Sequence, residues 1–252
     1  MEESIKIIKD QFQAAGDSML PELIHKYKSD VRSGVADLVK KAEKKIDALE
    51  KEWHRTKEMS RYEESYPSHF LICGIDEVGR GPLAGPVVAG AVILNKEDTI
   101  LYLNDSKKLS ASKREELYEE IISRSISYGL GYVSPEEIDR VNILQATYCA
   151  MRQAIQNLSV RPDILLNDAV TIPEISISQL PIIKGDAKSV SIAAASIIAK
   201  VTRDRMMEEY DKIFPEYAFA SNKGYGSAAH IEALKKYGPS PIHRKTFIGN
   251  FI

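Results

Sequence analysis

The sequence contains few cysteines, no long apolar run and almost no net charge. Cys73 and Cys149 are its only cysteines among 252 residues, and two ligands are too few for a zinc site. Both lie in apolar surroundings, which predicts buried free thiols in a reducing cytoplasm. The apolar runs are too short and too interrupted to span a bilayer, and residues 1–6 lack the basic and then apolar order of a signal peptide. We therefore expect a cytoplasmic chain with no membrane segment.

Several common catalytic motifs are also missing. No Walker A pattern occurs, and Gly79-Arg80-Gly81 lacks the spacing of a dinucleotide-binding loop. No Ser/His/Asp triad can be assembled, because no histidine has an evident nucleophile partner. We expect His54, His69, His230 and His243 to be surface or capping residues.

The charge is distributed unevenly along the chain. A formal net charge of −2 argues against a generally basic nucleic-acid binder. From residue 184 to the C-terminus, however, lysine and arginine outnumber the acids. An acidic cluster beside such a basic flank suits a metal-dependent enzyme that acts on a phosphodiester backbone. Charge alone still favours ordinary solvated helix surfaces.

Residues 1–66 form a predicted helical appendage. Apolar residues at spacings of three and four, from Val31 to Trp53, indicate one long amphipathic helix. Shorter helices are expected over residues 5–13 and 21–28, and Tyr66-Pro67 marks the boundary. The cluster Lys40, Lys41, Lys44 and Lys45 would extend a nucleic-acid surface, but interleaved acids favour a plain solvated face.

From residue 67 to 252 the pattern is that of an α/β domain. Apolar runs predict strands over residues 70–75, 87–94, 126–133, 163–167 and 180–183. Helices are expected over residues 112–123, 142–158, 189–213 and 227–237, the first with Ser112 as its N-cap. Three early strands joined by hairpin connections, followed by strands that alternate with helices, predict a mixed sheet with an antiparallel and a parallel half.

Four carboxylates follow the apolar strands directly or within a few residues. Asp76 and Glu77 come after the first strand, Asp168 after the fourth, and Asp186 just beyond the fifth. Ligands gather at the carboxyl ends of parallel strands, so we expect these side chains to converge. Four neighbouring carboxylates repel one another, and a divalent cation with oxygen ligands relieves that repulsion. The pattern predicts a Mg²⁺ or Mn²⁺ centre with two ions, which suits in-line phosphoryl displacement.

Other motifs provide potential substrate contacts near the acids. The glycines of Gly79-Arg80-Gly81 let the backbone approach a sugar or phosphate, although a tight turn explains them equally well. Ser106 and Lys107 offer phosphate donors in a loop. Lys200 and Arg203 extend from a helix that is otherwise rich in small residues, and from there they would reach a bound strand. Tyr225 lies between two glycines, where its ring would stack on a base or sugar.

Together these motifs resemble type 2 ribonuclease H, the ribonuclease HII family. The match covers about residues 69–250, and its longest and most specific part is residues 74–86. Further matching motifs lie, in the family's order, at residues 105–109, 184–188, 192–200 and 223–226. The resemblance implies an RNase H-like mixed five-stranded sheet flanked by helices, with a helical C-terminal part. Residues 1–66 are not part of the core family pattern.

The resemblance also implies an activity and the roles of individual residues. The enzyme would hydrolyse the RNA strand of RNA–DNA hybrids and would incise 5′ of single ribonucleotides in duplex DNA, leaving a 3′-hydroxyl and a 5′-phosphate, as in ribonucleotide excision repair. A monomer is expected. The catalytic acids would be Asp76, Glu77, Asp168 and Asp186. The residues Gly79, Arg80 and Gly81 would sense the 2′-hydroxyl through their backbone, and Tyr225 would stack at the sugar of the junction.

The chain departs from the family pattern at two positions, and two other functions remain open. Asn167 precedes Asp168 where the family usually has an apolar or small residue, and Ser227 replaces a threonine. One alternative is a non-catalytic hybrid-binding scaffold, which the intact set of acids disfavours. The other is a different RNase H-like nuclease, such as a junction resolvase or transposase. The Gly79-Arg80-Gly81 loop and Tyr225 disfavour that reading, because both serve ribose recognition.

Overall fold

The structure is a computed structural model that describes residues 3–252. The chain divides into two compact units, one comprising the described residues up to Lys57 and the other Glu58–Ile252. The first two residues of the predicted appendage lie outside the described part. The division falls before the sequence-based boundary at residue 66, so residues 58–66 pack with the second unit. No helix among residues 3–252 is long and apolar enough to cross a membrane.

The first unit contains three helices. They are α1 (Ile5–Ala14), α2 (Leu20–Tyr27) and α3 (Ser33–Met59), whose last residues belong to the second unit. Its core is built from Ile8, Tyr27, Val35 and Val39. The expected apolar stripe of α3 was wrong at its start, because the helix begins at Ser33 and Val31 is 97% exposed.

The second unit is built on one five-stranded mixed sheet. The strands are β1 (Ile72–Val78), β2 (Val87–Leu94), β3 (Ser125–Val133), β4 (Ile164–Asp168) and β5 (Ser178–Ile182). Their spatial order is β3-β2-β1-β4-β5. The pairs β1–β2 and β2–β3 are antiparallel, whereas β1–β4 and β4–β5 are parallel. The predicted mixed sheet with two halves is confirmed.

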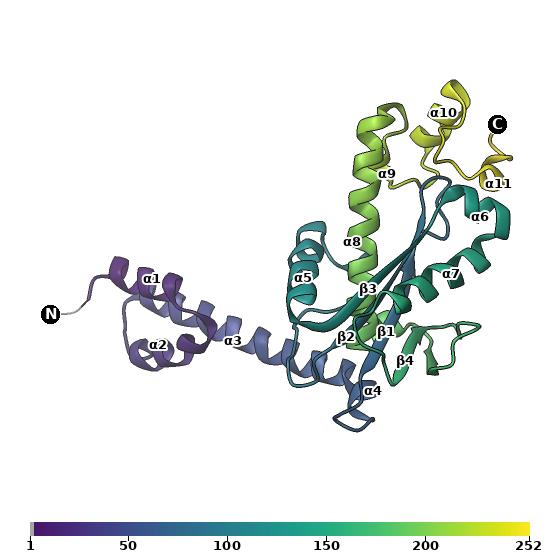
Figure 1. The fold of residues 1–252 in the computed structure, drawn as a ribbon. Coiled ribbons are helices and arrows are strands. Elements are labelled where there is room, and N and C mark those ends of the chain that lie inside the picture. Colours follow the sequence, from purple (N-terminus) through teal and green to yellow (C-terminus); the bar gives the residue numbers. More distant parts are fainter. Residues whose placement is uncertain (1–2) are drawn as a thin grey trace. The chain divides into compact units, whose positions relative to one another are not determined.

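Helices cover both faces of this sheet (Figure 1). Helix α7 (Ile143–Gln156) packs on one face, where its alanines and Met151 meet the apolar residues of β1, β2 and β4. On the other face lie α8 (Val190–Ile213) and α5 (Ala111–Arg124). The contact with α8 is close: a Cβ added to Gly74 of β1 would lie 2.0 Å from the Ser191 carbonyl carbon. The small residues predicted to bring α8 close to the sheet therefore have that function.

Three local boundaries differ from the sequence-based expectations. Strand β1 continues through Asp76 and Glu77, so these acids lie within the strand and not after it. The N-cap of α5 is Ser110, whose side chain accepts a hydrogen bond from the Lys113 amide, and not Ser112. A separate helix α6 (Pro135–Val141) precedes α7, and Asn142 caps the latter.

The remaining helices are short. Helix α4 (Arg61–Glu64) precedes the sheet, and the C-terminal part holds α9 (Phe219–Asn222), α10 (Ala228–Tyr237) and α11 (Lys245–Ile248). Phe219, Leu234 and Ile248 form its core together with Met207 of α8. The predicted helical C-terminal part is therefore present and is anchored on α8.

Two buried histidines form a hydrogen-bonded chain in this C-terminal part. His230 Nδ1 lies 2.8 Å from the Tyr225 carbonyl and must donate to it, which leaves His230 Nε2 as an acceptor. His243 Nε2 lies 2.9 Å from that atom and donates to it, while His243 Nδ1 accepts from the Ser240 amide. Every ring nitrogen is satisfied only when both imidazoles are neutral. The expectation that these histidines are surface or capping residues was wrong, since their side chains are 0% and 3% exposed.

This pair predicts a loss of stability in mild acid. Burial, followed by repulsion from His230, lowers the pKa of His243 from 6.5 to about 4. Above pH 6.5 His243 is neutral in both states, whereas between pH 6.5 and 4 only the unfolded chain binds the proton. The free energy of unfolding should therefore fall by about 3 kcal/mol across that window because of this group.

Chemical denaturation of the wild type and His243→Gln at pH 7 and pH 4.5 measures this contribution. We expect the variant to be less stable at pH 7 but to lose less stability on acidification. His25→Gln is the matched control, because His25 is exposed, and it should keep the wild-type pH dependence. Equal pH dependence in all three proteins would contradict the assignment.

Candidate active site

The four predicted acids lie at one edge of the parallel half of the sheet. Ile75 of β1 is paired with Asn167 of β4, so Asp76 and Asp168 follow on neighbouring parallel strands. Asp186 lies in a short turn, Gly185–Ala187, after the next strand, β5. The Gly185 amide donates to Asp168 Oδ1 over 2.7 Å and ties this turn to β4. The carboxyl ends of β1, β4 and β5 therefore bring these side chains together.

The acids of the site are close enough for their charges to shift one another's pKa values. Burial, with repulsion from Glu77 and Asp168, raises the pKa of Asp76 well above its ordinary value. Burial also raises the pKa of Glu77, and Arg80, 3.3 Å from Glu77 Oε1, opposes this. Burial, Asp105 and Asp168 raise the pKa of Asp186. Keeping all of these groups ionised therefore requires a positive charge nearby.

The donor set fits a hard divalent cation that keeps other ligands. Every candidate ligand is a carboxylate oxygen, which suits Mg²⁺ or Mn²⁺ and not a softer metal. Within residues 3–252, no three Asp, Glu, His or Cys side chains are arranged to hold an ion by themselves. Mg²⁺ is usually bound by one or two carboxylates with water and substrate phosphate, so this arrangement fits an ion that the substrate helps to bind.

A cavity of about 330 Å³ opens beside Asp76 and Glu77. Its walls contain four more of the predicted site residues, namely Ser106, Lys107, Lys200 and Tyr225. Partial burial lowers the pKa of Lys107, but Asp105, Asp76 and Asp186 outweigh it and raise that pKa overall. Lys107 is thus a cation held close to the acids.

Lys200 already forms an ion pair within the protein, which its sequence position did not indicate. Its ammonium lies 2.6 Å from Asp204 Oδ1, and the side chains of this pair are 15% and 12% exposed. Burial lowers the pKa of Lys200, and Asp204 opposes that shift. Lys200 lines the cavity, but it would have to share its charge between Asp204 and a substrate.

Arg203 does not face the cavity. The expectation that it reaches a bound strand was wrong, because its side chain is fully buried. Its guanidinium donates to the carbonyls of Pro86, Lys223 and Ala84 over 2.8–3.0 Å. Arg203 therefore joins the β1–β2 connection to the segment before Tyr225, and its effect on substrate would be indirect.

Arg244, which was not singled out from the sequence, complements Arg203. It is also fully buried and donates to the carbonyls of Gly79, Arg80 and Gly85 over 2.5–3.0 Å. Burial and the neighbouring Arg203 lower its pKa to about 9. Buried cations without a carboxylate partner are costly, and here the backbone carbonyls stabilise them. Arg244 therefore holds Gly79 and Arg80 directly, whereas Arg203 holds a later part of the β1–β2 connection at Ala84 and Pro86.

The loop itself has a conformation that requires glycine. Gly79 has φ +92°, and a Cβ there would lie 2.3 Å from Arg203 Nε. Gly81 is exposed, and a Cβ there would lie 3.9 Å from the Tyr225 ring. Tyr225 is 44% exposed, and its carbonyl accepts from His230. Gly81 and Tyr225 therefore lie side by side and are exposed, as is Arg80, whereas Gly79 is buried.

Sequence reasoning missed two polar residues at the cavity. Ser196 of α8 hydrogen-bonds to Asp76 and lies 3.0 Å from Ser106 through the two hydroxyl oxygens. Arg114 of α5 donates to the carbonyls of Ser106 and Leu109 and so shapes the loop that carries Lys107. The sequence did contain an indication of the Ser196 contact, because a serine within an otherwise apolar helix segment often makes a buried polar contact.

Asn167 lies on the opposite side of the sheet from Asp168, since successive strand residues point to opposite faces. Its side chain is fully buried and donates to the Val170 carbonyl and to Gln179 Oε1 over 3.1 and 2.8 Å. Gln179 in turn bonds to the backbone of Ile172. The unusual residue therefore secures the loop after β4 and leaves the acid itself unchanged.

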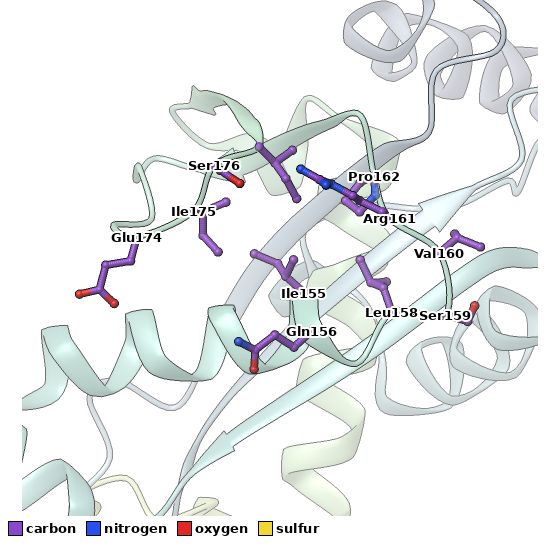
Figure 2. A pocket seen from close by; sticks show the side chains of 11 residues that line it. Ile155, Gln156, Leu158, Ser159, Val160, Arg161, Pro162, Glu174, Ile175 and Ser176 are labelled. Atoms are coloured by element: carbon purple, nitrogen blue, oxygen red, sulfur yellow. The ribbon is translucent and has the colours of Figure 1, made fainter.

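A second hollow, of about 390 Å³, contains none of the predicted site residues. Figure 2 shows Ile155, Ile175 and Leu158 between Glu174 at one end and Ser159 at the other. Its lining mixes aliphatic and polar side chains, and the one acid among them is Glu174. The cavity beside Asp76 is thus the site with catalytic chemistry.

Comparisons with known proteins agree with this geometry. A family model described as Ribonuclease HII matches residues 73–249, and one described as Ribonuclease HII N-terminal domain matches residues 4–67. A ribonuclease HII from Lachnoclostridium phytofermentans is 59% identical over 249 residues, which is 98% of each chain.

Two solved structures are similar to about two thirds or more of the chain. A ribonuclease HII from Archaeoglobus fulgidus, solved in a complex with PCNA, is 30% identical with a TM-score of 0.60 and covers 72% of this chain and 96% of its own. The ribonuclease H2 of Pyrococcus horikoshii is 31% identical with a TM-score of 0.58, covering 69% and 92%. The chain therefore belongs to the ribonuclease HII family and is an RNA–DNA hybrid endoribonuclease.

Proposed function

We propose that the enzyme incises 5′ of single ribonucleotides in duplex DNA, as well as within longer hybrids, and leaves a 3′-hydroxyl and a 5′-phosphate. The observation that carries this proposal is the adjacency of two structures. A carboxylate centre on β1, β4 and the turn after β5 lies beside Tyr225 and a Gly-Arg-Gly loop whose Arg80 and Gly81 are exposed. The carboxylate centre would catalyse cleavage, and the loop with Tyr225 would recognise the ribose.

Asp76, Glu77, Asp168 and Asp186 would hold two Mg²⁺ or Mn²⁺ ions together with water and a substrate phosphate. When bound, such ions activate a water and stabilise the leaving oxygen of an in-line displacement. Ser196 orients the Asp76 carboxylate, and Lys107 provides a positive charge for the phosphate backbone.

Ribose selection would come from backbone groups of Gly79, Arg80 and Gly81. The 2′-hydroxyl distinguishes RNA from DNA at one position. Recognition of a single hydroxyl by backbone groups requires that the backbone be rigid. Arg244 supports this rigidity by binding the carbonyls of Gly79 and Arg80, and Arg203 binds those of Ala84 and Pro86 further along the same connection. The free thiols of Cys73 and Cys149 suit the predicted cytoplasmic location. Location and the monomeric state stay predictions.

The proposal is tested first with a labelled duplex that carries one ribonucleotide. We expect incision with Mg²⁺ or Mn²⁺ and a loss of about 10³-fold in Asp76→Asn, because several kcal/mol of transition-state stabilisation depend on the metal site. The same variant should unfold at a higher temperature than the wild type without divalent ions, since it removes one repelling carboxylate. Incision that survives Asp76→Asn would exclude this site.

Replacing Arg244 by lysine tests the role of the buried arginines. Lysine keeps the charge but cannot donate to three carbonyls at once. We expect kcat/KM on the single-ribonucleotide duplex to fall at least about tenfold, with the rise in melting temperature on adding Mg²⁺ unchanged. Arg205→Lys is the control, because Arg205 is exposed and its guanidinium contacts Glu115, Glu119 and the Tyr118 ring, all of which belong to α5; it should resemble the wild type.

Tyr225 is tested by separating its ring from its hydroxyl. Tyr225→Phe keeps a stacking surface and should retain activity within about twofold. Tyr225→Ala should raise KM about tenfold, since aromatic stacking contributes about 1–3 kcal/mol per base. Equal kinetics of the two variants would argue against stacking at this position.

A further inference from the structure

Residues 58–66 pack with the second unit although the N-terminal family model extends to residue 67. Helix α4, Arg61–Glu64, lies in this segment. Tyr62 and Tyr66 pack against an apolar cluster that includes Ile72 and Ile192. Glu63, between those tyrosines, is only 6% exposed. Burying a carboxylate costs free energy unless the group is paired or hydrogen-bonded, so the contacts of Glu63 need an explanation.

Glu63 binds the first turn of α8. Its Oε1 accepts hydrogen bonds from Ser189 Oγ over 2.5 Å and from the Ser191 amide over 3.0 Å. A negative group is stabilised at the N-terminus of a helix by the helix dipole and the free amides. Burial nevertheless raises the pKa of Glu63, and its Oε2 is buried without a hydrogen-bond partner. The contact is therefore maintained at a cost in desolvation.

The contact leads directly to the catalytic acids. Ser189 caps α8 by accepting from the Ile192 amide, and the Ser189 amide donates to the Gly185 carbonyl. Gly185 begins the turn that carries Asp186, and its own amide donates to Asp168. A chain of hydrogen bonds thus joins Glu63 to the turn of Asp186 and to Asp168.

We propose that Glu63 is a positioning residue for the catalytic centre. It holds Ser189, and through Ser189 it fixes the turn that places Asp186 opposite Asp168. The end of the N-terminal region is thereby part of the active-site support and not only a linker. This inference rests on the proposed roles of Asp168 and Asp186 in the proposed function.

The test uses full-length variants at Glu63 and at its exposed neighbour Glu64. Glu63→Met keeps the volume and removes the acceptor, whereas Glu63→Gln keeps an acceptor oxygen for Ser189 and Ser191. Glu64→Met is the matched control on the same helix. Hydrogen exchange of the amides in residues 185–191 is measured on the metal-free proteins, followed by incision at increasing Mg²⁺ concentrations.

We expect exchange in residues 185–191 to be about tenfold faster in Glu63→Met and near wild type in the other two variants. The Mg²⁺ concentration for half-maximal incision should rise at least about tenfold in Glu63→Met, as for other residues that orient metal ligands. KM for the duplex should stay within about twofold. If the role of Glu63 were purely structural, Glu63→Met would lower the melting temperature but would not raise the Mg²⁺ requirement at an unchanged KM.

Unchanged exchange in Glu63→Met would overturn the inference. If that variant does not fold, Glu63→Gln still decides, because exchange clearly faster than that of Glu64→Met would show that the retained acceptor does not hold the turn. The exchange measurement needs no activity, so it is separate from the proposed function. A wild type that fails to incise would refute the function and leave the exchange result to be read by itself.

Discussion

The repulsion between carboxylates on neighbouring strand ends is the constraint on which the site depends. The parallel pairing of β1 with β4 places Asp76 beside Asp168 whether or not their charges are balanced. Burial first, and repulsion between the acids second, raise the pKa values of Asp76, Glu77 and Asp186. Such a cluster is expected to weaken the metal-free fold, and in the proposed function divalent cations and a phosphate backbone would stabilise it. Metal affinity and substrate binding are therefore expected to be coupled.

Helix α8 connects the parts of the molecule that surround this cluster. Its first turn is held by Glu63, its middle presents Ser196 to Asp76, and Arg203 further along binds the carbonyls of Ala84 and Pro86 in the β1–β2 connection. The helix can do this because Gly74 leaves room for its backbone against β1. In the proposed function, the groups that cleave and the groups that select the ribose would therefore be positioned by the same helix.

The sequence predicted what depends on local pattern and missed what depends on distant backbone. Period-two apolar runs and strand-end acids were enough for the mixed sheet and for the convergence of Asp76, Asp168 and Asp186. Arg203 was misassigned, because a helix pattern does not show that its partners are carbonyls from two separate loops. The burial of Glu63 and His243 was missed for the same reason. In a sequence, a buried polar residue cannot be distinguished from an exposed one until the position of its hydrogen-bond partner is known.

Anomalous X-ray scattering from Mn²⁺ in crystals of the enzyme with an uncleavable hybrid tests the central claim most directly. The account predicts two manganese peaks among Asp76, Glu77, Asp168 and Asp186, with a substrate phosphate between them and the ribose beside Gly79-Arg80-Gly81. No manganese at these carboxylates, or manganese only elsewhere on the chain, would contradict it.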